Sequence, residues 1–192
     1  MDLAAGPVGL RPIRRRDAEA WAEVRARNRE WLREWDATMP PGGEPWASGF
    51  GGMVREMRAQ ARQGRMLPFV VTYDGRLVGQ VTVNNIVWGS ARFGQLGYWV
   101  DQRYAGRGII PTAVALAVDH AFQAMGLHRM EVAIRPENTA SLRVVEKLGF
   151  QCIGTASRYL HINGAWRDHV LFALTAEDVP DGLLQRWEAA RR

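Results

Sequence analysis

Hydrophobic residues follow two different periods along the chain, and these predict a mixed α/β domain. Near the N-terminus they recur every three or four positions, as at Trp21, Val24 and Trp35, which is typical of an amphipathic helix. From Leu67 onward, short apolar runs separated by turn residues such as Asn163-Gly164 indicate strands and hairpins. The predicted strands are Val8–Ile13, Leu67–Tyr73, Leu77–Trp88, Arg92–Val100, Arg129–Ile134, Gln151–Ile162 and Ala165–Leu174. The predicted helices are one capped by Asp17 that runs to about Asp36, then Ser48–Gln63, Ile109–Met125, Thr139–Leu148 and a short tail helix with Leu183, Leu184 and Trp187.

The order of these elements predicts the topology of one sheet. Three antiparallel strands lead into a loop and a helix, and this helical crossover makes Arg129–Ile134 parallel to Arg92–Val100. We therefore expect a mixed, mostly antiparallel sheet of about seven strands with a central parallel pair, flanked by helices, in a single domain over residues 1–192. The first two helices and the Pro/Gly-rich loop Met39–Trp46 form a flap, in which Trp46 either walls an acceptor slot or only packs on the sheet.

Composition and charge exclude several classes of protein. No apolar run is long enough for a membrane span, and the first residues lack the regions of a signal peptide, so we expect a cytoplasmic protein with no membrane partner. The net charge is +5, and the basic residues are almost all arginine, which looks like a coding bias and weakens any inference of nucleic-acid binding. A nucleic-acid-binding domain is a distant alternative, because the chain has the charge but no recognition motif. Cys152 is the only cysteine, and we expect it to be a small, half-buried residue of a strand.

The stretch from Gly97 to Thr112 has the pattern of an anion site. Gly106 and Gly108 lie between a strand and a helix, where a backbone without Cβ atoms and the unpaired N–H groups of a first helical turn can approach a phosphate. Pro111 has no N–H, so the donors must come from the residues before it. The only lysine is Lys147, which excludes a P-loop, and Pro111 also stands where a dinucleotide fingerprint needs its third glycine.

Two separated motifs together resemble a known superfamily. The first is Arg103-x-x-Gly106-x-Gly108, and the second is Pro-Glu-Asn138-x-x-Ser141, which runs on to Gly149-Phe150. In this order they resemble the GCN5-related N-acetyltransferase (GNAT) superfamily, whose mixed sheet has the predicted layout. The early Asn28-Arg-Glu-Trp-Leu-Arg-Glu-Trp and the late Asn163-Gly-Ala-Trp-Arg-Asp168-His resemble the branch of ribosomal-protein alanine N-acetyltransferases (RimJ/RimL type).

This resemblance implies a site for acetyl-CoA as co-substrate, with the central parallel pair splayed apart. The pyrophosphate would lie on the N–H groups of the glycine loop, with Arg103 or Arg107 beside it, and the pantetheine arm would pair along the strand edge, with Asn138 on its other side. Main-chain donors suit the phosphates and the amides of the arm. The expected cofactor-binding residues are Tyr98, Trp99, Val100, Arg103, Gly106, Arg107, Gly108, Ile109, Ile110 and Asn138.

Acyl transfer needs a neutral amine, a polarised carbonyl and a proton for the leaving thiolate. Ser141, one helical turn after Asn138, is the candidate proton donor, although a serine there could instead bond its own backbone. Some protein α-amine acetylases have a tyrosine and a glutamate where this chain has Val145 and Ala133, so that mechanism cannot be carried over. Candidate bases are Glu131, on the strand face of Ala133, and Asp168. Counting back from the Asn163-Gly164 turn pairs Asp168 with Tyr159 and Trp166 with His161, so Asp168 could instead brace the hairpin through Tyr159 or a backbone amide.

The sequence leaves the acceptor open. Our first reading is an N-acetyltransferase that acts by direct transfer on the α-amine of a protein N-terminus, possibly of a ribosomal protein. The alternatives are acetylation of a small amine or aminoglycoside, which predicts acidic residues lining the acceptor slot, and a module that binds acyl-CoA without turnover. No two of the four histidines share a metal-ligand spacing with a carboxylate, so we expect no metal, and the chain could be a monomer or a homodimer.

Overall fold

The computed structural model describes residues 2–43 and 49–191, and these form one eight-stranded sheet flanked by helices. The strand order is β1-β2-β3-β4-β5-β6-β8-β7, and every neighbouring pair is antiparallel except β5 and β6. The predicted fold class is therefore confirmed. The strands are β1 (Leu3–Ala5), β2 (Val8–Pro12), β3 (Leu67–Tyr73), β4 (Arg76–Val87), β5 (Phe93–Val100), β6 (Arg129–Ile134), β7 (Gln151–Ile162) and β8 (Ala165–Thr175).

The seven predicted strands are all present, each within one residue of its expected bounds. The eighth, β1, is too short to leave a pattern in the sequence and pairs only with β2. The helices are α1 (Ala18–Arg27), α2 (Arg29–Arg33), α3 (Gly49–Arg62), α4 (Ile109–Asp119), α5 (Thr139–Leu148) and α6 (Leu183–Ala189). None of the helices in the described part of the chain is long and apolar enough to cross a membrane.

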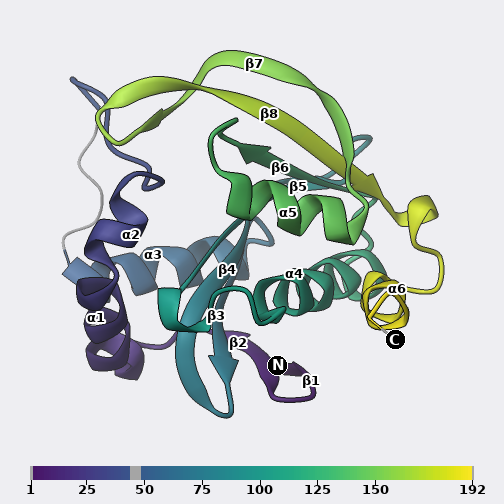
Figure 1. The fold of residues 1–192 in the computed structure, drawn as a ribbon, viewed down its shortest axis with the longest axis horizontal. Coiled ribbons are helices and arrows are strands. Elements are labelled where there is room, and N and C mark those ends of the chain that lie inside the picture. Colours follow the sequence, from purple (N-terminus) through teal and green to yellow (C-terminus); the bar gives the residue numbers. More distant parts are fainter. Residues whose placement is uncertain (1, 44–48, 192) are drawn as a thin grey trace.

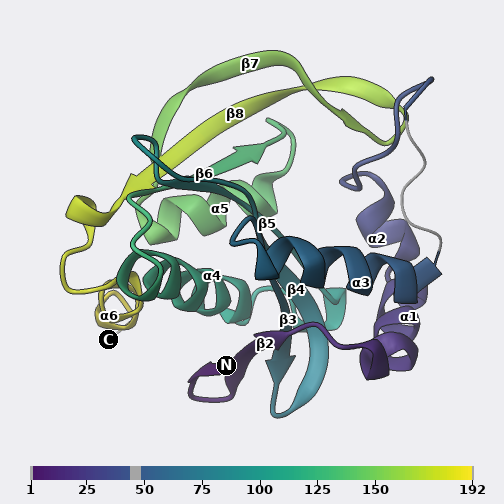
Figure 2. The same cartoon turned by 180° about the vertical axis from the view of Figure 1, so that it is seen from behind.

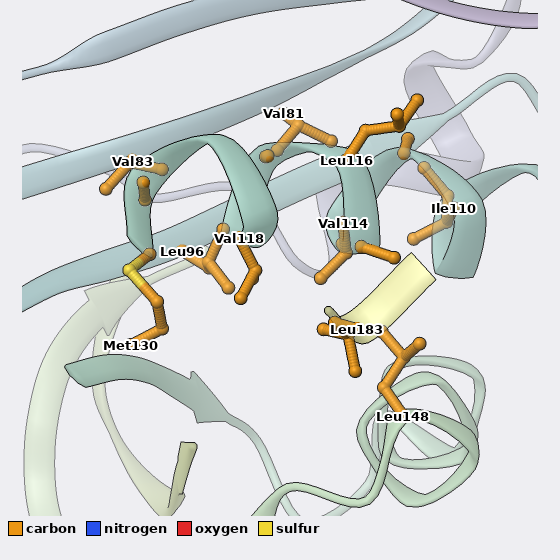
Figure 3. Packing of buried hydrophobic residues seen from close by; sticks show 14 of the residues in the cluster. Val81, Val83, Leu96, Ile110, Val114, Leu116, Val118, Met130, Leu148 and Leu183 are labelled. Carbon is orange, nitrogen blue, oxygen red and sulfur yellow. The ribbon is translucent and has the colours of Figure 1, made fainter. Parts of the chain in front are cut away.

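The helices cover the two faces of the sheet in separate groups (Figures 1 and 2). Helices α4, α5 and α6 pack on one face, and α1, α2 and α3 lie on the other. Figure 3 shows the larger core, where α4 lies between sheet residues such as Val81 and Met130 and helix residues such as Leu148 and Leu183. Almost every residue of α4 is buried, so this helix, which begins at the glycine loop, is held firmly in place.

The predicted first helix is broken in two at Asn28, and the prediction of one continuous helix is wrong. The side-chain amide of Asn28 donates to the carbonyl of Val24 (2.8 Å), and its Oδ1 accepts from the backbone N–H of Gln102 (2.9 Å). Asparagine competes with the helical backbone in this way, and its φ of −102° and ψ of 16° turn the chain into α2. The break therefore ties the flap to the loop after β5.

Three smaller expectations also change. Asp17 precedes α1 but does not cap it, because its carboxylate accepts from the N–H of Arg14 (2.7 Å) and pairs with Arg11 (2.8 Å). Cys152 is exposed on β7, which lies at the edge of the sheet, and is not half-buried. The helix after the glycine loop ends at Gly126 as expected, but its last part, His120–Ala124, is a π-helical turn. Trp46 lies outside the described residues.

The hairpin of β7 and β8 arches over the end of the sheet and meets the flap (Figure 1). The backbone N–H of Asn163 donates to the carbonyl of Asp36 (3.0 Å), and Thr38 donates to the carbonyl of His161 (2.9 Å). Ala37 and Ile162 form a β-bridge at the same place. This junction closes one side of the space that opens between the ends of β5 and β6.

Candidate active site

A cavity opens where the two parallel strands diverge. The ladder between β5 and β6 ends at the pair of Leu96 and Val132, and beyond it each strand continues to pair only with its outer neighbour. The space between them has a volume of about 320 Å³. Its walls come from β4, β5, β6, α5, the hairpin and the end of the flap, namely Trp35, Ala37, Gln80, Thr82, Leu96, Gly97, Tyr98, Trp99, Val132, Ala133, Ile134, Arg135, Asn138, Ser141, Leu160, Ile162 and His169.

The edge of β5 presents free backbone groups to this cavity. The N–H of Asp101 donates to the carbonyl of Val78 (2.7 Å), so it points toward β4. Successive peptide groups of a strand point to opposite edges, so Trp99 also faces β4, whereas Tyr98 and Val100 face the side where β6 has diverged. Their N–H and C=O groups are therefore available to an extended, amide-containing molecule laid along the strand.

The glycine loop ends in an N-terminus suited to an anion. Gly106 and Gly108 have φ of 77° and 76°, in the left-handed region, and Gly108 is the N-cap residue of α4. A Cβ at Gly106 would touch no atom within 4 Å, so the loop faces open space there. The first N–H groups of α4, at Ile109 and Ile110, have no acceptor within the helix. The loop thus offers several main-chain donors at the positive end of a helix dipole.

The two arginines of this loop differ in how they are held. Arg103 pairs with Asp101 (3.0 Å), whereas the Arg107 guanidinium carbon lies 5.3 Å from the centre of the Tyr104 ring and forms no ion pair within the described chain. Arg107 is therefore the freer cation.

Asp101 is buried and also binds Arg27, the last residue of α1, at 2.8 Å. Burial opposes ionisation of Asp101, but the hydrogen bonds from Arg103 and Arg27 outweigh it and lower its pKa to about 2.

Asn138 and Ser141 lie together on the other wall of the cavity. The Oδ1 of Asn138 accepts from the backbone N–H of Ser141 (3.1 Å), so Asn138 caps α5 as expected and its amide N–H groups remain for a ligand. The hydroxyl of Ser141 forms no hydrogen bond with its own backbone or with any other described residue. The Tyr98 hydroxyl donates to the Ser141 carbonyl (3.4 Å) and spans the gap between β5 and α5. Burial raises the pKa of Tyr98, so it stays protonated as a donor.

Neither carboxylate suggested as a base is part of the cavity wall. Glu131 accepts from Arg129 Nε (2.7 Å), one step along β6 from the cavity residues. Asp168 is exposed and accepts from the backbone N–H of Arg158 (2.7 Å), which is the bracing contact considered above. The expected pairing of Asp168 with Tyr159 is wrong, because a bulge between Ala156 and Leu160 turns Tyr159 toward His169.

Sequence reasoning gave no role to His169, which is buried in the cavity wall. Its Nδ1 lies 3.0 Å from the carbonyl of Arg167, and its ring centre lies 5.9 Å from that of Tyr159. Burial, followed by the nearby Arg135, lowers the pKa of His169, against the opposing effects of its bond to Arg167 and of the Glu137 and Asp168 carboxylates. The strand position of His169 was visible in the sequence, but the bulge that orients its neighbour was not.

The end of the cavity beside the flap is mostly apolar. Its side chains include Trp35, Ala37, Leu160 and Ile162, and no aspartate or glutamate occurs among the described lining residues. Asp36, next in the chain, is paired with Arg25, whose guanidinium lies 5.3 Å from the Trp99 ring centre. Within residues 2–43 and 49–191, no group of three or more histidine, cysteine, aspartate or glutamate side chains is placed to hold a metal ion.

Comparisons with known proteins agree with this geometry. Residues 8–151 match the family model of the acetyltransferase (GNAT) domain. The chain is 32% identical over 180 residues to the ribosomal protein uS5-alanine N-acetyltransferase of Escherichia coli (strain K12), covering 90% of each. It is 41% identical over 105 residues to the probable N-acetyltransferase YjcK of Bacillus subtilis (strain 168), where the match spans 55% of this chain and 58% of that relative. The solved structure of Mycobacterium smegmatis RimJ in complex with CoA-disulfide matches with a TM-score of 0.92 at 41% identity, covering 100% of this chain and 95% of that one.

Proposed function

The chain belongs to the GNAT acetyltransferase family, and from this premise we propose that it moves the acetyl group of acetyl-CoA to the N-terminal α-amine of a ribosomal protein. The N-acetyltransferase class follows from the family. The acceptor is suggested by the uS5-alanine enzyme, which aligns over 90% of both chains. A ribosomal acceptor would place the reaction in the cytoplasm. Residues 1–192 would act as one catalytic domain.

The observation that carries this proposal is the cavity between the diverging ends of β5 and β6, where β5 leads into the glycine loop and the apolar end beside the flap would take the acceptor. The residues fit acetyl-CoA chemically. The N–H groups of Gly106 to Ile110 would hold the pyrophosphate with Arg107 beside it, and the edge groups of Tyr98 and Val100 would pair with the amides of the pantetheine arm. The free amide of Asn138 would donate from the opposite wall.

Acetyl-CoA supplies an activated acyl group, and the remaining chemistry falls to the protein. The N–H of Val100, if it donates to the thioester carbonyl, would stabilise the negative charge that develops there. The hydroxyl of Ser141, which has no partner within the described chain, would donate a proton to the leaving thiolate. The walls of the cavity would hold amine and thioester in contact, so that direct transfer would need no covalent enzyme intermediate.

The lining of the acceptor end favours a peptide N-terminus over a polycationic small amine. Polyamines and aminoglycosides carry several positive charges, which carboxylates in the slot would balance. The described lining instead has apolar side chains, with Arg135 as its only permanent cation, and these suit a single amine on a small residue such as alanine. Among the described residues, no observation on the site favours the small-amine alternative; Glu44, an acidic residue of the flap, lies outside them.

The test is acetylation of a defined peptide. The protein is mixed with acetyl-CoA and a peptide that begins with alanine and carries an internal lysine, and the acetyl group is located by fragment mass. We expect acetylation on the α-amine alone; the same peptide with a blocked N-terminus is the control and should stay unmodified. Acetylation of lysine, or of spermidine in a parallel reaction in preference to the peptide, would contradict the proposal. Binding of acetyl-CoA with no product on any acceptor would favour a silent binding module.

A further inference from the structure

His169 is the histidine of the cavity wall, and the proposed function has so far left it unused. Its side chain is only 3% exposed, and it lines the same cavity as Trp99 and Ser141. The register of β6 and β8 pairs Ala133 with Leu171, so His169, two residues before Leu171, lies on the same face of the sheet as Ala133. Leu160 of the apolar end of the cavity pairs with Arg167, two residues before His169, so it lies on this face too.

The hydrogen bond of His169 fixes which ring nitrogen is free. The carbonyl of Arg167 can only accept, so the Nδ1 that lies 3.0 Å from it carries the proton. In the neutral ring Nε2 then has a lone pair, and Nε2 forms no hydrogen bond with any residue in the described part of the chain. The T-shaped contact with Tyr159 holds the ring from the β7 side, and the Tyr159 hydroxyl is in turn bound by Gln95 (3.3 Å). The ring is thus oriented and its free nitrogen is an acceptor.

Burial and the nearby charges together lower the pKa of His169, which favours the neutral form of its ring. Burial is the main cause that lowers its pKa, and Arg135 on the β6 side acts in the same direction. Glu137 and its β8 neighbour Asp168 act in the opposite direction, but both carboxylates are exposed, and Glu137 is paired with Arg135. From β7, Tyr159 contributes an uncharged ring. A buried neutral imidazole beside the acceptor end is a competent proton acceptor.

We propose that His169 is the general base of the transfer, a role that rests on the proposed function. Nε2 takes one proton from the α-ammonium of the acceptor, and the resulting neutral nitrogen attacks the thioester carbon. The nitrogen–carbon bond forms, the carbon–sulfur bond breaks, and the nitrogen loses a second proton while the thiolate gains one. His169 returns its proton to solvent, so the reaction releases one proton overall. Glu131 and Asp168, held by Arg129 and by the Arg158 N–H, are not needed as bases.

The test is the pH dependence of kcat/KM for the alanine peptide between pH 5.5 and 9, in the wild type, in His169→Gln and in the control His128→Gln. His128 is an exposed histidine that pairs with Glu177 and lies outside the cavity lining. Because a peptide α-amine has a pKa of about 8, an enzyme without a base must use the neutral fraction, and its rate falls about tenfold for each pH unit below that value. With His169 as base, kcat/KM stays level from about pH 8 down to the pKa of His169.

The expected result is a level region in the wild type and in His128→Gln, and a steady fall in His169→Gln. The ratio of wild type to His169→Gln should be about 30-fold larger at pH 6.5 than at pH 9. A partly unfolded variant would lose rate equally at all pH values and keep the level region, so the slope separates a structural role from a chemical one. A wild type that itself falls tenfold for each unit between pH 8 and 6.5 overturns the proposal. A wild type with no activity on any α-amine overturns the proposed function and the role of His169 with it.

Discussion

Replacing Asp101 with asparagine tests whether the ion pairs that Asp101 forms at the start of the glycine loop stabilise the fold. Asp101 is 1% exposed, accepts from Arg27 and Arg103, and caps the short turn that leads into the loop by accepting the Arg103 N–H at 3.1 Å. Asparagine has the same shape and can keep this backbone bond. It loses the negative charge that both guanidinium groups face.

The magnitude follows from the pKa of Asp101. A fall from the usual 3.8 to about 2 corresponds, at 1.36 kcal/mol for each pH unit, to about 2.5 kcal/mol of stability at neutral pH. Because the folded pKa is lowered, this contribution is present in full above about pH 5 and is lost as the pH falls through 3.8 toward 2. For a protein of this size a loss of about 2 kcal/mol should lower Tm by roughly 4–8 °C.

Urea unfolding of the wild type, Asp101→Asn and Asp181→Asn at pH 7 and at pH 3.5 would measure this effect. Asp181 is exposed and forms no ion pair with any other described residue, so its variant should unfold like the wild type. We expect Asp101→Asn to be less stable at pH 7 and the difference to shrink at pH 3.5. Equal midpoints at pH 7, or a difference that does not change with pH, would refute the reasoning. The variant should also bind acetyl-CoA less tightly, because Asp101 positions the loop.

Three further substitutions test the site. Ser141→Ala should lower kcat about 100-fold while acetyl-CoA binding, measured by calorimetry, stays within about twofold; an unchanged kcat would exclude Ser141 as the proton donor. Gly108→Ala should raise the KM for acetyl-CoA several-fold because φ is 76° there, whereas Gly89→Ala, with φ of 74° in the turn between β4 and β5 at the other end of β5, carries similar strain and should leave that KM unchanged. Ala37→Glu adds a carboxylate to the acceptor end and should shift activity from the peptide toward spermidine, which competition between the two acceptors would reveal.

Most of the fold could be predicted because its signals are local. The Asn163-Gly164 turn and the alternation of apolar residues set the strands, and the single helical crossover between β5 and β6 set the one parallel pair. The glycine loop and the Asn138 motif together resembled the GNAT superfamily, and the family match over residues 8–151 confirms that resemblance. The resemblance could not show that Asn28 breaks the first helix, because its partner, the Gln102 N–H, lies 74 residues away in the chain.

The sequence did not point to His169 for a related reason. Counting back from the Asn163-Gly164 turn gives the correct pair of His161 and Trp166, but the count holds only while each residue of β7 opposes one residue of β8. At Arg158, where φ is 48°, extra residues of β7 enter the hairpin, and Tyr159 moves to the face of His169 while Asp168 stays on the other. A hairpin without the bulge would pair Tyr159 with Asp168. The residue that lines the cavity is instead His169, the next residue in the chain. A shift of one position therefore changes the candidate base from the exposed carboxylate of Asp168 to the buried imidazole of His169. Of the two, His169 alone lines the cavity, and its Nε2 has no hydrogen-bond partner among the described residues.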